Sequence, residues 1–220
     1  MPELPEVETI KRDLNKHAAG KIIAALKINP KRCFKLRGLK QAKFLNLPVL
    51  EFKKKLIGLK IANIDRRAKN LIFKLTDNRL PKNQAEFLLI HLKMTGQLIY
   101  RQADGLLIAG GHFIKNGEKN LPNKYTQLTF IFNDGSRLFY NDLRQFGWVR
   151  FLNQTELNNR LAKFGPEPLT PQFTFKIFQA ILKKSPDKKI KALLLDQEKI
   201  AGLGNIYADE VCFYGRARPQ

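Results

Sequence analysis

Apolar residues near the start of the chain recur at helical spacing. Val7, Ile10, Leu14 and Ala18 are three or four positions apart, so they share one face of a helix. A glycine follows two residues later, and glycine commonly ends helices. We therefore predict a helix over residues 5–18.

From residue 21 to about residue 151 the pattern changes to that of β-strands. Short apolar or alternating runs are separated by turn signals, such as the hairpin sequence Asn133-Asp134-Gly135. A short helix is expected near residues 49–57, and the Gly- and Asn-rich residues 103–121 are expected to form a long loop. So many strands with turns indicate a β-sandwich or barrel. The strands are predicted over residues 21–28, 60–66, 70–75, 86–92, 97–100, 127–132, 137–140 and 148–151.

Helical signals return after residue 151. The stretch "GPEPLTP" at 165–171 is typical of a linker, and Ser185-Pro186 is typical of a helix cap followed by a first-turn proline. We predict two domains, one rich in β-strands to about residue 160 and one helical beyond it. The helices are predicted over residues 155–163, 175–183, 185–196 and 206–214.

The charge of the chain points to a polyanionic partner. Lys and Arg number 40 against 19 Asp and Glu, which gives a net charge of +21. Nucleic acid is the leading candidate, and a solvated basic surface is the alternative. No apolar run is long enough to span a bilayer, and no signal-peptide pattern is present, so we expect a cytoplasmic protein. The two cysteines, Cys33 and Cys212, fit buried thiols in a reducing compartment better than a disulfide or metal site.

The opening sequence "MPELPEVET" places a proline where a nucleophile would be useful. Once the initiator Met1 is removed, Pro2 carries an α-amino group, whose pKa is about 7.7–8.0 against about 10.4 for lysine. Such an amine is a ready nucleophile at neutral pH. Because it is secondary, it forms an iminium that stays cationic and favours elimination at the neighbouring carbon, with Glu3 available to move protons. The alternative is a proline without any catalytic role.

The stretch "PELPEVET" resembles the opening of bacterial formamidopyrimidine-DNA glycosylase, a bifunctional family that removes 8-oxoguanine and ring-opened purines. Further blocks follow in the family's order and spacing across essentially the whole chain. The related endonuclease VIII group has glycine where Leu4 stands here, which favours the formamidopyrimidine branch. The blocks are "RRAKNLIFKL" at 66–75, "HLKMTGQL" at 91–98, "NDLRQFGW" at 141–148, "GPEPL" at 165–169, "IKALLLDQ" at 190–197 and "GLGNIYADE" at 202–210.

The resemblance implies an α+β fold. An N-terminal catalytic β-sandwich with flanking helices is expected over residues 1–160, and an incomplete helix–two-turn–helix DNA-binding domain over residues 161–220. The family normally continues into a four-cysteine zinc finger, so a C-terminally truncated form is expected. Two cysteines cannot form a tetrahedral zinc site. We therefore expect no metal and no organic cofactor in this chain.

The resemblance also implies catalytic roles near the start of the chain. Pro2 attacks C1′ of the damaged nucleotide, Glu3 handles protons, and Glu6 is included with them. Lys69, in "RRAKN", lies beside the scissile phosphate and assists β-elimination. The alternative for Lys69 is one surface lysine among 40 basic residues.

Three further residues are implied to fill the gap left by an extruded nucleotide. Met94 and Phe146 wedge between bases, and Arg144 hydrogen-bonds the orphaned opposite base. Composition alone would instead place Met94 and Phe146 in the core.

Four further residues are expected to bind DNA, three of them through phosphates. Tyr125 stands where many relatives carry a histidine, although its hydroxyl can still donate to a phosphate. His91 begins the "HLKMTGQL" block, and Lys184 belongs to a basic cluster near the cap at 185–186. Asn205 follows a glycine-rich turn at a helix start, a natural phosphate seat. The alternatives are a solvated helix face for Lys184 and a structural turn for Asn205.

The sequence departs from the family pattern at two further positions. Lys93 replaces a common glycine beside Met94, and Gln145 replaces a common arginine between Arg144 and Phe146. Both change local charge more than they affect the chemistry. His17 and His112 are expected to be surface residues.

The leading hypothesis is a monomeric base excision repair glycosylase with AP lyase activity, which acts in the bacterial cytoplasm at the nucleoid. Its partner is double-stranded DNA containing oxidised purines or abasic sites. An AP lyase with little glycosylase activity and a non-catalytic binder of damaged DNA are the alternatives.

Overall fold

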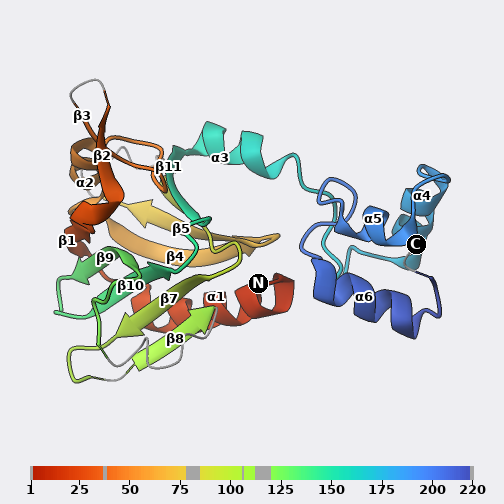
Figure 1. Ribbon diagram of the computed structural model, residues 1–220, viewed down its shortest axis with the longest axis horizontal. Coiled ribbons are helices and arrows are strands. Elements are labelled where there is room, and N and C mark those ends of the chain that lie inside the picture. Colours follow the sequence, from red (N-terminus) through yellow and green to blue (C-terminus); the bar gives the residue numbers. More distant parts are fainter. Residues whose placement is uncertain (1, 37–38, 78–84, 106, 112–119, 219–220) are drawn as a thin grey trace.

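The computed structural model describes residues 2–36, 39–77, 85–105, 107–111 and 120–218. Its N-terminal part is a sandwich of two antiparallel sheets, as predicted (Figure 1). One sheet has the strand order β1-β9-β10-β7-β8 and the other the order β11-β6-β5-β4. The first comprises β1 (Ile23–Ile28), β7 (Gly96–Arg101), β8 (Leu107–Gly111), β9 (Thr126–Phe132) and β10 (Arg137–Asp142). The second comprises β4 (Lys60–Arg67), β5 (Asn70–Thr76), β6 (Glu86–His91) and β11 (Trp148–Asn153).

The helix α1 (Leu4–Ala18) packs along the sandwich with the apolar face that its spacing predicts. Val7, Ile10, Leu14 and Ala18 are all buried in the main core. The helix α2 (Val49–Leu56) contributes Phe52 and Leu56 to the same core, as the short helix predicted near residues 49–57. Burial of these apolar faces is what fixes both helices against the sheets.

The helical part of the chain lies beside the sandwich and has a small core of its own. It contains α4 (Phe175–Lys183), α5 (Ile190–Leu195) and α6 (Asn205–Tyr214), and the helix α3 (Gln154–Leu161) leads into it. Figure 1 shows the first turn of α1 directed toward α6. The amide of Leu4 donates to the carbonyl of Gly202 at 3.2 Å, so the two parts meet at the start of the chain. The core of the helical part is formed by Leu193, Leu194, Ile200, Ala208 and Cys212.

The predicted loop at residues 103–121 was wrong in part, because it contains β8. The glycines that indicated a loop instead allow close packing. A Cβ on Gly110 would overlap the side chain of Ile10 in α1, and one on Gly111 would overlap the backbone of β7. Residues 112–119, with His112, lie outside the described part of the chain.

Two other predictions of secondary structure also need correction. The hairpin of β2 (Cys33–Leu36) and β3 (Leu39–Ala42) was not predicted. The helix predicted over residues 185–196 begins only at Ile190, and Ser185 instead accepts a turn hydrogen bond from the amide of Lys188. Residues 186–189 are exposed, so no buried apolar face stabilises a helix there despite the cap signal.

The prediction that His17 lies at the surface also needs correction. His17 is half-buried and its ring lies against that of Tyr100.

Within the described residues, no helix combines the length and apolar character that crossing a membrane requires.

Candidate active site and DNA-binding surface

The carboxylate of Glu3 is held by the N-terminus of α6. Its two oxygens accept hydrogen bonds from the amides of Gly204 at 2.8 Å, Ile206 at 3.0 Å and Tyr207 at 3.3 Å. These amides lie at the start of a helix, where they lack intrahelical partners and the helix dipole favours negative charge. Glu3 is 1% exposed, so its carboxylate has a fixed position at the junction of the two parts of the chain.

Glu6 supports this arrangement from the first turn of α1. One carboxylate oxygen accepts the backbone amide of Glu3 at 2.9 Å, and the other accepts the hydroxyl of Tyr207 at 3.0 Å. Burial and this carboxylate raise the pKa of Tyr207. Glu6 therefore links the start of α1 to α6, next to Pro2, which is itself buried.

Lys69 lies on the turn between β4 and β5. Its side chain is 8% exposed, and burial lowers the pKa of its ammonium below the ordinary value. Lys93 lowers that pKa further, whereas the negative charges of Glu3 and Glu6 act in the opposite direction. The structure thus brings Lys69 into the electrostatic neighbourhood of both predicted carboxylates.

A cavity of about 290 Å³ lies at this junction and contains several predicted site residues. Lys69, His91 and Asn205 all line it, together with Lys93 and Gly204. A larger cavity of about 740 Å³ adjoins it and extends to α3 and the residues just after it, where Arg160 and Lys163 contribute positive charge. Three residues that are far apart in sequence are therefore gathered around one cavity.

His91 is neutral at physiological pH. Burial, Lys93 and Lys69 lower its pKa to about 3. The amide of Lys93 donates to its Nδ1 at 2.9 Å, which leaves the proton on Nε2. A neutral imidazole with a free N–H donor is suited to bind a phosphate oxygen by a hydrogen bond. Its ring also lies against Trp148, with ring centroids 5.5 Å apart.

Met94, Arg144 and Phe146 form one cluster on two neighbouring loops. Met94 is 41% exposed and Phe146 53% exposed, so neither is a core residue. The guanidinium of Arg144 lies 4.7 Å from the ring centroid of Phe146 and donates to Sδ of Met94 at 3.1 Å. Two exposed apolar side chains joined by an arginine match the chemistry needed to occupy a vacated position in a base stack.

The remaining predicted contacts lie apart from the cavity. Tyr125 is half-buried on the loop before β9, where its carbonyl accepts the amide of Asp142 at 3.0 Å, near the loop that carries Arg144. Lys184 is exposed at the C-terminal end of α4. Neither residue lines either of the two cavities.

Comparison with known proteins decides the family. The formamidopyrimidine-DNA glycosylase N-terminal domain matches residues 1–149, and the formamidopyrimidine-DNA glycosylase H2TH domain matches residues 164–220. The chain belongs to the formamidopyrimidine-DNA glycosylase family. Proteins of this family are bifunctional glycosylases and AP lyases of base excision repair.

Individual relatives agree with this assignment. The chain is 35% identical over 223 residues to the formamidopyrimidine-DNA glycosylase of Enterococcus faecalis, covering 100% of this chain and 67% of the relative. It is 36% identical over 221 residues to that of Streptococcus pneumoniae, covering 100% of this chain and 68% of the relative. A solved complex of Lactococcus lactis Fpg with abasic-site DNA matches with a TM-score of 0.76 and 32% identity, over 99% of this chain and 68% of that one.

A buried ion-pair network, which the sequence did not reveal, fixes the turn of Lys69 in this family member. Glu167 is 4% exposed and accepts the amide of Ala68 at 2.5 Å, while it pairs with Arg66 at 2.7 Å and Arg67 at 3.1 Å. Arg66 also pairs with Glu8 at 2.9 Å. Glu167 belongs to the "GPEPL" block, and its position in that block was the one feature of the sequence that could have indicated a functional role.

A second unpredicted residue, Asp142, orders the loop of Arg144 and Phe146. One of its carboxylate oxygens accepts the hydroxyl of Thr95 at 2.5 Å, and the other accepts the amide of Gly147 at 2.8 Å. The oxygen of Thr95 in turn accepts the amide of Arg144 at 2.9 Å. Asp142 therefore connects the Met94 loop with the Arg144 loop.

Backbone strain concentrates at the same loops. Among the described non-glycine residues with positive φ, Ala68 (52°), Lys93 (52°) and Gln145 (61°) each adjoin a predicted site residue. Such conformations cost about 1–3 kcal/mol each and cluster at functional sites.

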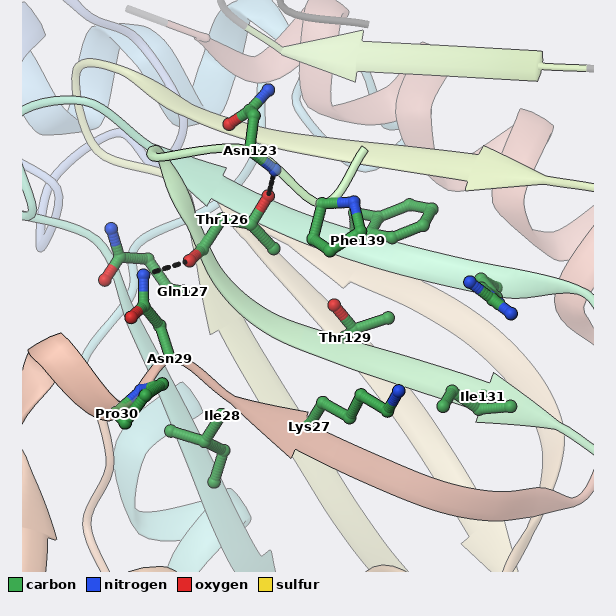
Figure 2. Close-up of a pocket in the computed structure, with 12 residues that line it drawn as sticks. Lys27, Ile28, Asn29, Pro30, Asn123, Thr126, Gln127, Thr129, Ile131 and Phe139 are labelled. Carbon is green, nitrogen blue, oxygen red and sulfur yellow. Dashed lines mark hydrogen bonds between the residues drawn. The ribbon is translucent and has the colours of Figure 1, made fainter. Parts of the chain in front are cut away.

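Other features of the chain lie outside this site. A cavity of about 290 Å³ on the outer face of the first sheet is lined by Lys27, Thr129, Arg137 and Phe139 among others, and by none of the predicted site residues (Figure 2). Cys33 and Cys212 are free thiols. In the described part of the chain no three His, Cys, Asp or Glu residues gather as metal ligands.

Proposed function

We propose that this chain excises oxidised purines from DNA and cleaves the resulting abasic site through an iminium on Pro2. The observation that carries the proposal is the fixed carboxylate of Glu3, which adjoins Pro2 and shares the junction with Lys69. Solved Lactococcus lactis Fpg structures contain abasic-site DNA and Fapy-dG DNA, which supports these lesions as substrates. Because the relatives come from bacteria, the proposed place of action is the bacterial nucleoid. The chain is proposed to act there as a monomer.

The first step begins once Met1 has been removed and Pro2 has a free secondary amine. The lone pair of this nitrogen attacks C1′ of the flipped nucleotide, and the bond from C1′ to the base breaks. The base leaves with that electron pair and takes up a proton. The carboxylate of Glu3 is proposed to take the N–H proton from the attached nitrogen of Pro2 and pass it to O4′ as the C1′–O4′ bond breaks, which leaves an iminium between Pro2 and C1′.

Elimination follows because the iminium withdraws electrons from the neighbouring carbon. A base removes a proton from C2′, the electron pair forms the C2′–C3′ double bond, and the phosphate on C3′ leaves. Water then hydrolyses the iminium and regenerates the amine of Pro2. Lys69 is proposed to assist this step beside the leaving phosphate, where His91 and Asn205 supply neutral hydrogen-bond donors.

Glu6 is proposed to act by positioning, because both of its carboxylate oxygens are already engaged by Glu3 and Tyr207. Met94, Arg144 and Phe146 are proposed to fill the space left by the flipped nucleotide, and Tyr125 and Lys184 to contact the backbone away from the lesion.

The proposal is tested by borohydride trapping on a duplex with an abasic site. Mass spectrometry first establishes that the purified protein begins with Pro2. The wild-type chain is expected to form a covalent adduct that Pro2→Gly forms poorly. Absence of any adduct from a correctly processed chain contradicts the proposal and leaves a damaged-DNA-binding protein. Release of 8-oxoguanine, compared with cleavage of a preformed abasic site, separates the bifunctional enzyme from a lyase with little glycosylase activity.

A further inference from the structure

Lys93 lies where the two cavities of the site meet. Five residues line both the cavity that contains Lys69 and the larger cavity beside it, namely Asn70, His91, Lys93, Phe164 and Gln197. Among these five, Lys93 is the one lysine or arginine, and the pKa of the remaining basic group, His91, is lowered to about 3. A DNA strand that passes from one cavity to the other would meet this charge at the boundary.

The backbone at Lys93 is better suited to glycine than to lysine. Its φ of 52° lies in the left-handed region, which glycine adopts without steric cost. Its amide is held by Nδ1 of His91, so the strained conformation is fixed rather than incidental. A strained non-glycine residue beside a site is an indication that its side chain has a role there.

The ammonium of Lys93 is exposed and available to a ligand. In the described part of the chain no carboxylate forms an ion pair with it. The acids that face Lys69 are Glu3 and Glu6, and their carboxylates are already bound by the amides of α6 and by Tyr207. The charge of Lys93 is nevertheless close enough to lower the pKa values of both Lys69 and His91.

We propose that Lys93 is a further DNA-contacting residue of the site, whose ammonium binds a phosphodiester that flanks the flipped nucleotide, together with Lys69. The inference rests on the proposed function, because it takes damaged DNA as the ligand. Two ammonium groups repel each other in the empty cavity, and a phosphate between them replaces this repulsion by two attractions. Lys93 thus contributes to binding of the backbone at the place where the strand is cut.

Equilibrium binding measurements distinguish the contribution of the Lys93 charge from that of its backbone conformation. The ligand is a duplex containing tetrahydrofuran, an abasic analogue that cannot form an iminium, and the affinity is measured against salt concentration. Loss of one phosphate contact reduces the slope of log K against log salt by about 0.9 and weakens binding about 8-fold at about 0.1 M salt. Lys93→Gly is expected to show both effects, and Lys93→Arg neither. Lys54→Gln, an exposed lysine on α2, is the matched control.

Two further measurements complete the test. A neutral methylphosphonate at the phosphate beside the tetrahydrofuran is expected to weaken binding of the wild-type chain more than binding of Lys93→Gly. Unchanged affinity and unchanged salt slope in Lys93→Gly overturn the inference. Thermal unfolding checks that the variant is folded, which glycine at this φ favours. The proposed function is tested separately, and it fails if the wild-type chain is not trapped by borohydride. In that case the binding titration still decides the role of Lys93.

Discussion

Glu3 and Gly204 are 201 residues apart in sequence, yet the carboxylate of Glu3 accepts the amide of Gly204 at 2.8 Å. The contact joins the residue after the proposed nucleophile to the first turn of α6. It makes the position of the proposed catalytic carboxylate depend on how the helical part of the chain docks on the sandwich. DNA binding by the helical part and the proposed chemistry at the N-terminus therefore share one structural element.

Gly204→Ala is expected to disrupt this contact. A Cβ on Gly204 would fall against the carboxylate of Glu3. Because the carboxylate must move, borohydride trapping is expected to slow by roughly 10²-fold, the loss typical of a catalytic group displaced by about 1 Å. Val211→Ala on the same helix is the control, since Val211 is 44% exposed. Trapping by Gly204→Ala at the wild-type rate would show that Glu3 does not need this position.

The ion pair of Glu167 with Arg66 is expected to matter for stability as well as for activity. Glu167→Gln leaves Arg66, which is 8% exposed, with Glu8 as its remaining described ion-pair partner. Breaking a buried pair costs about 3–5 kcal/mol, and the remaining pair with Glu8 favours the lower end of this range. Urea unfolding measures the loss of stability, with the exposed Glu51→Gln as the control. A change below about 1 kcal/mol, the value of a surface ion pair, would contradict the assigned role.

Acid is expected to weaken the same network. Arg66, Lys11 and Arg12 lower the pKa of Glu8 from 4.5 to about 2, against the opposing effect of burial. Since the pKa is lower in the folded state than in the unfolded chain, this contribution to stability is present above about pH 4.5. It is lost as the pH falls toward about 2. Glu8→Gln should therefore show a smaller loss of unfolding free energy over this pH window than the wild-type chain. Equal pH dependence in the two proteins would contradict the network.

The sequence predicted those parts of the fold that depend on local periodicity. The apolar face of α1 follows from the helical spacing of residues such as Val7 and Ile10, and eight of the strands follow from short apolar or alternating runs bounded by turns. The strand β8 was not predicted because its glycines allow close packing with other segments: Gly110 packs against Ile10 of α1 and Gly111 against the backbone of β7. The start of α5 was misplaced because a local cap signal at residues 185–186 is not supported by burial.

The sequence predicted some residues of the site and missed others. Family blocks identified Lys69, His91 and Asn205, which the structure gathers around one cavity. Composition alone would have placed Met94 and Phe146 in the core, although both are exposed. Glu167 and Asp142 were missed because a buried ion pair or hydrogen bond between distant residues leaves no periodic signal in the sequence.

The hydroxyl of Thr95 is expected to control recognition of the vacated base position. Thr95→Val removes the donor to Asp142 and the acceptor for the amide of Arg144, so the loop that carries Arg144 and Phe146 loses its support. Leaving the buried carboxylate oxygen of Asp142 unpaired costs about 1–3 kcal/mol. We expect Thr95→Val to lose affinity for a duplex with an abasic analogue, but not for an undamaged duplex, which offers no gap to fill. Thr95→Ser keeps the hydroxyl and is the control. Equal losses for both duplexes would mean that the loop supports general DNA binding rather than recognition of the gap.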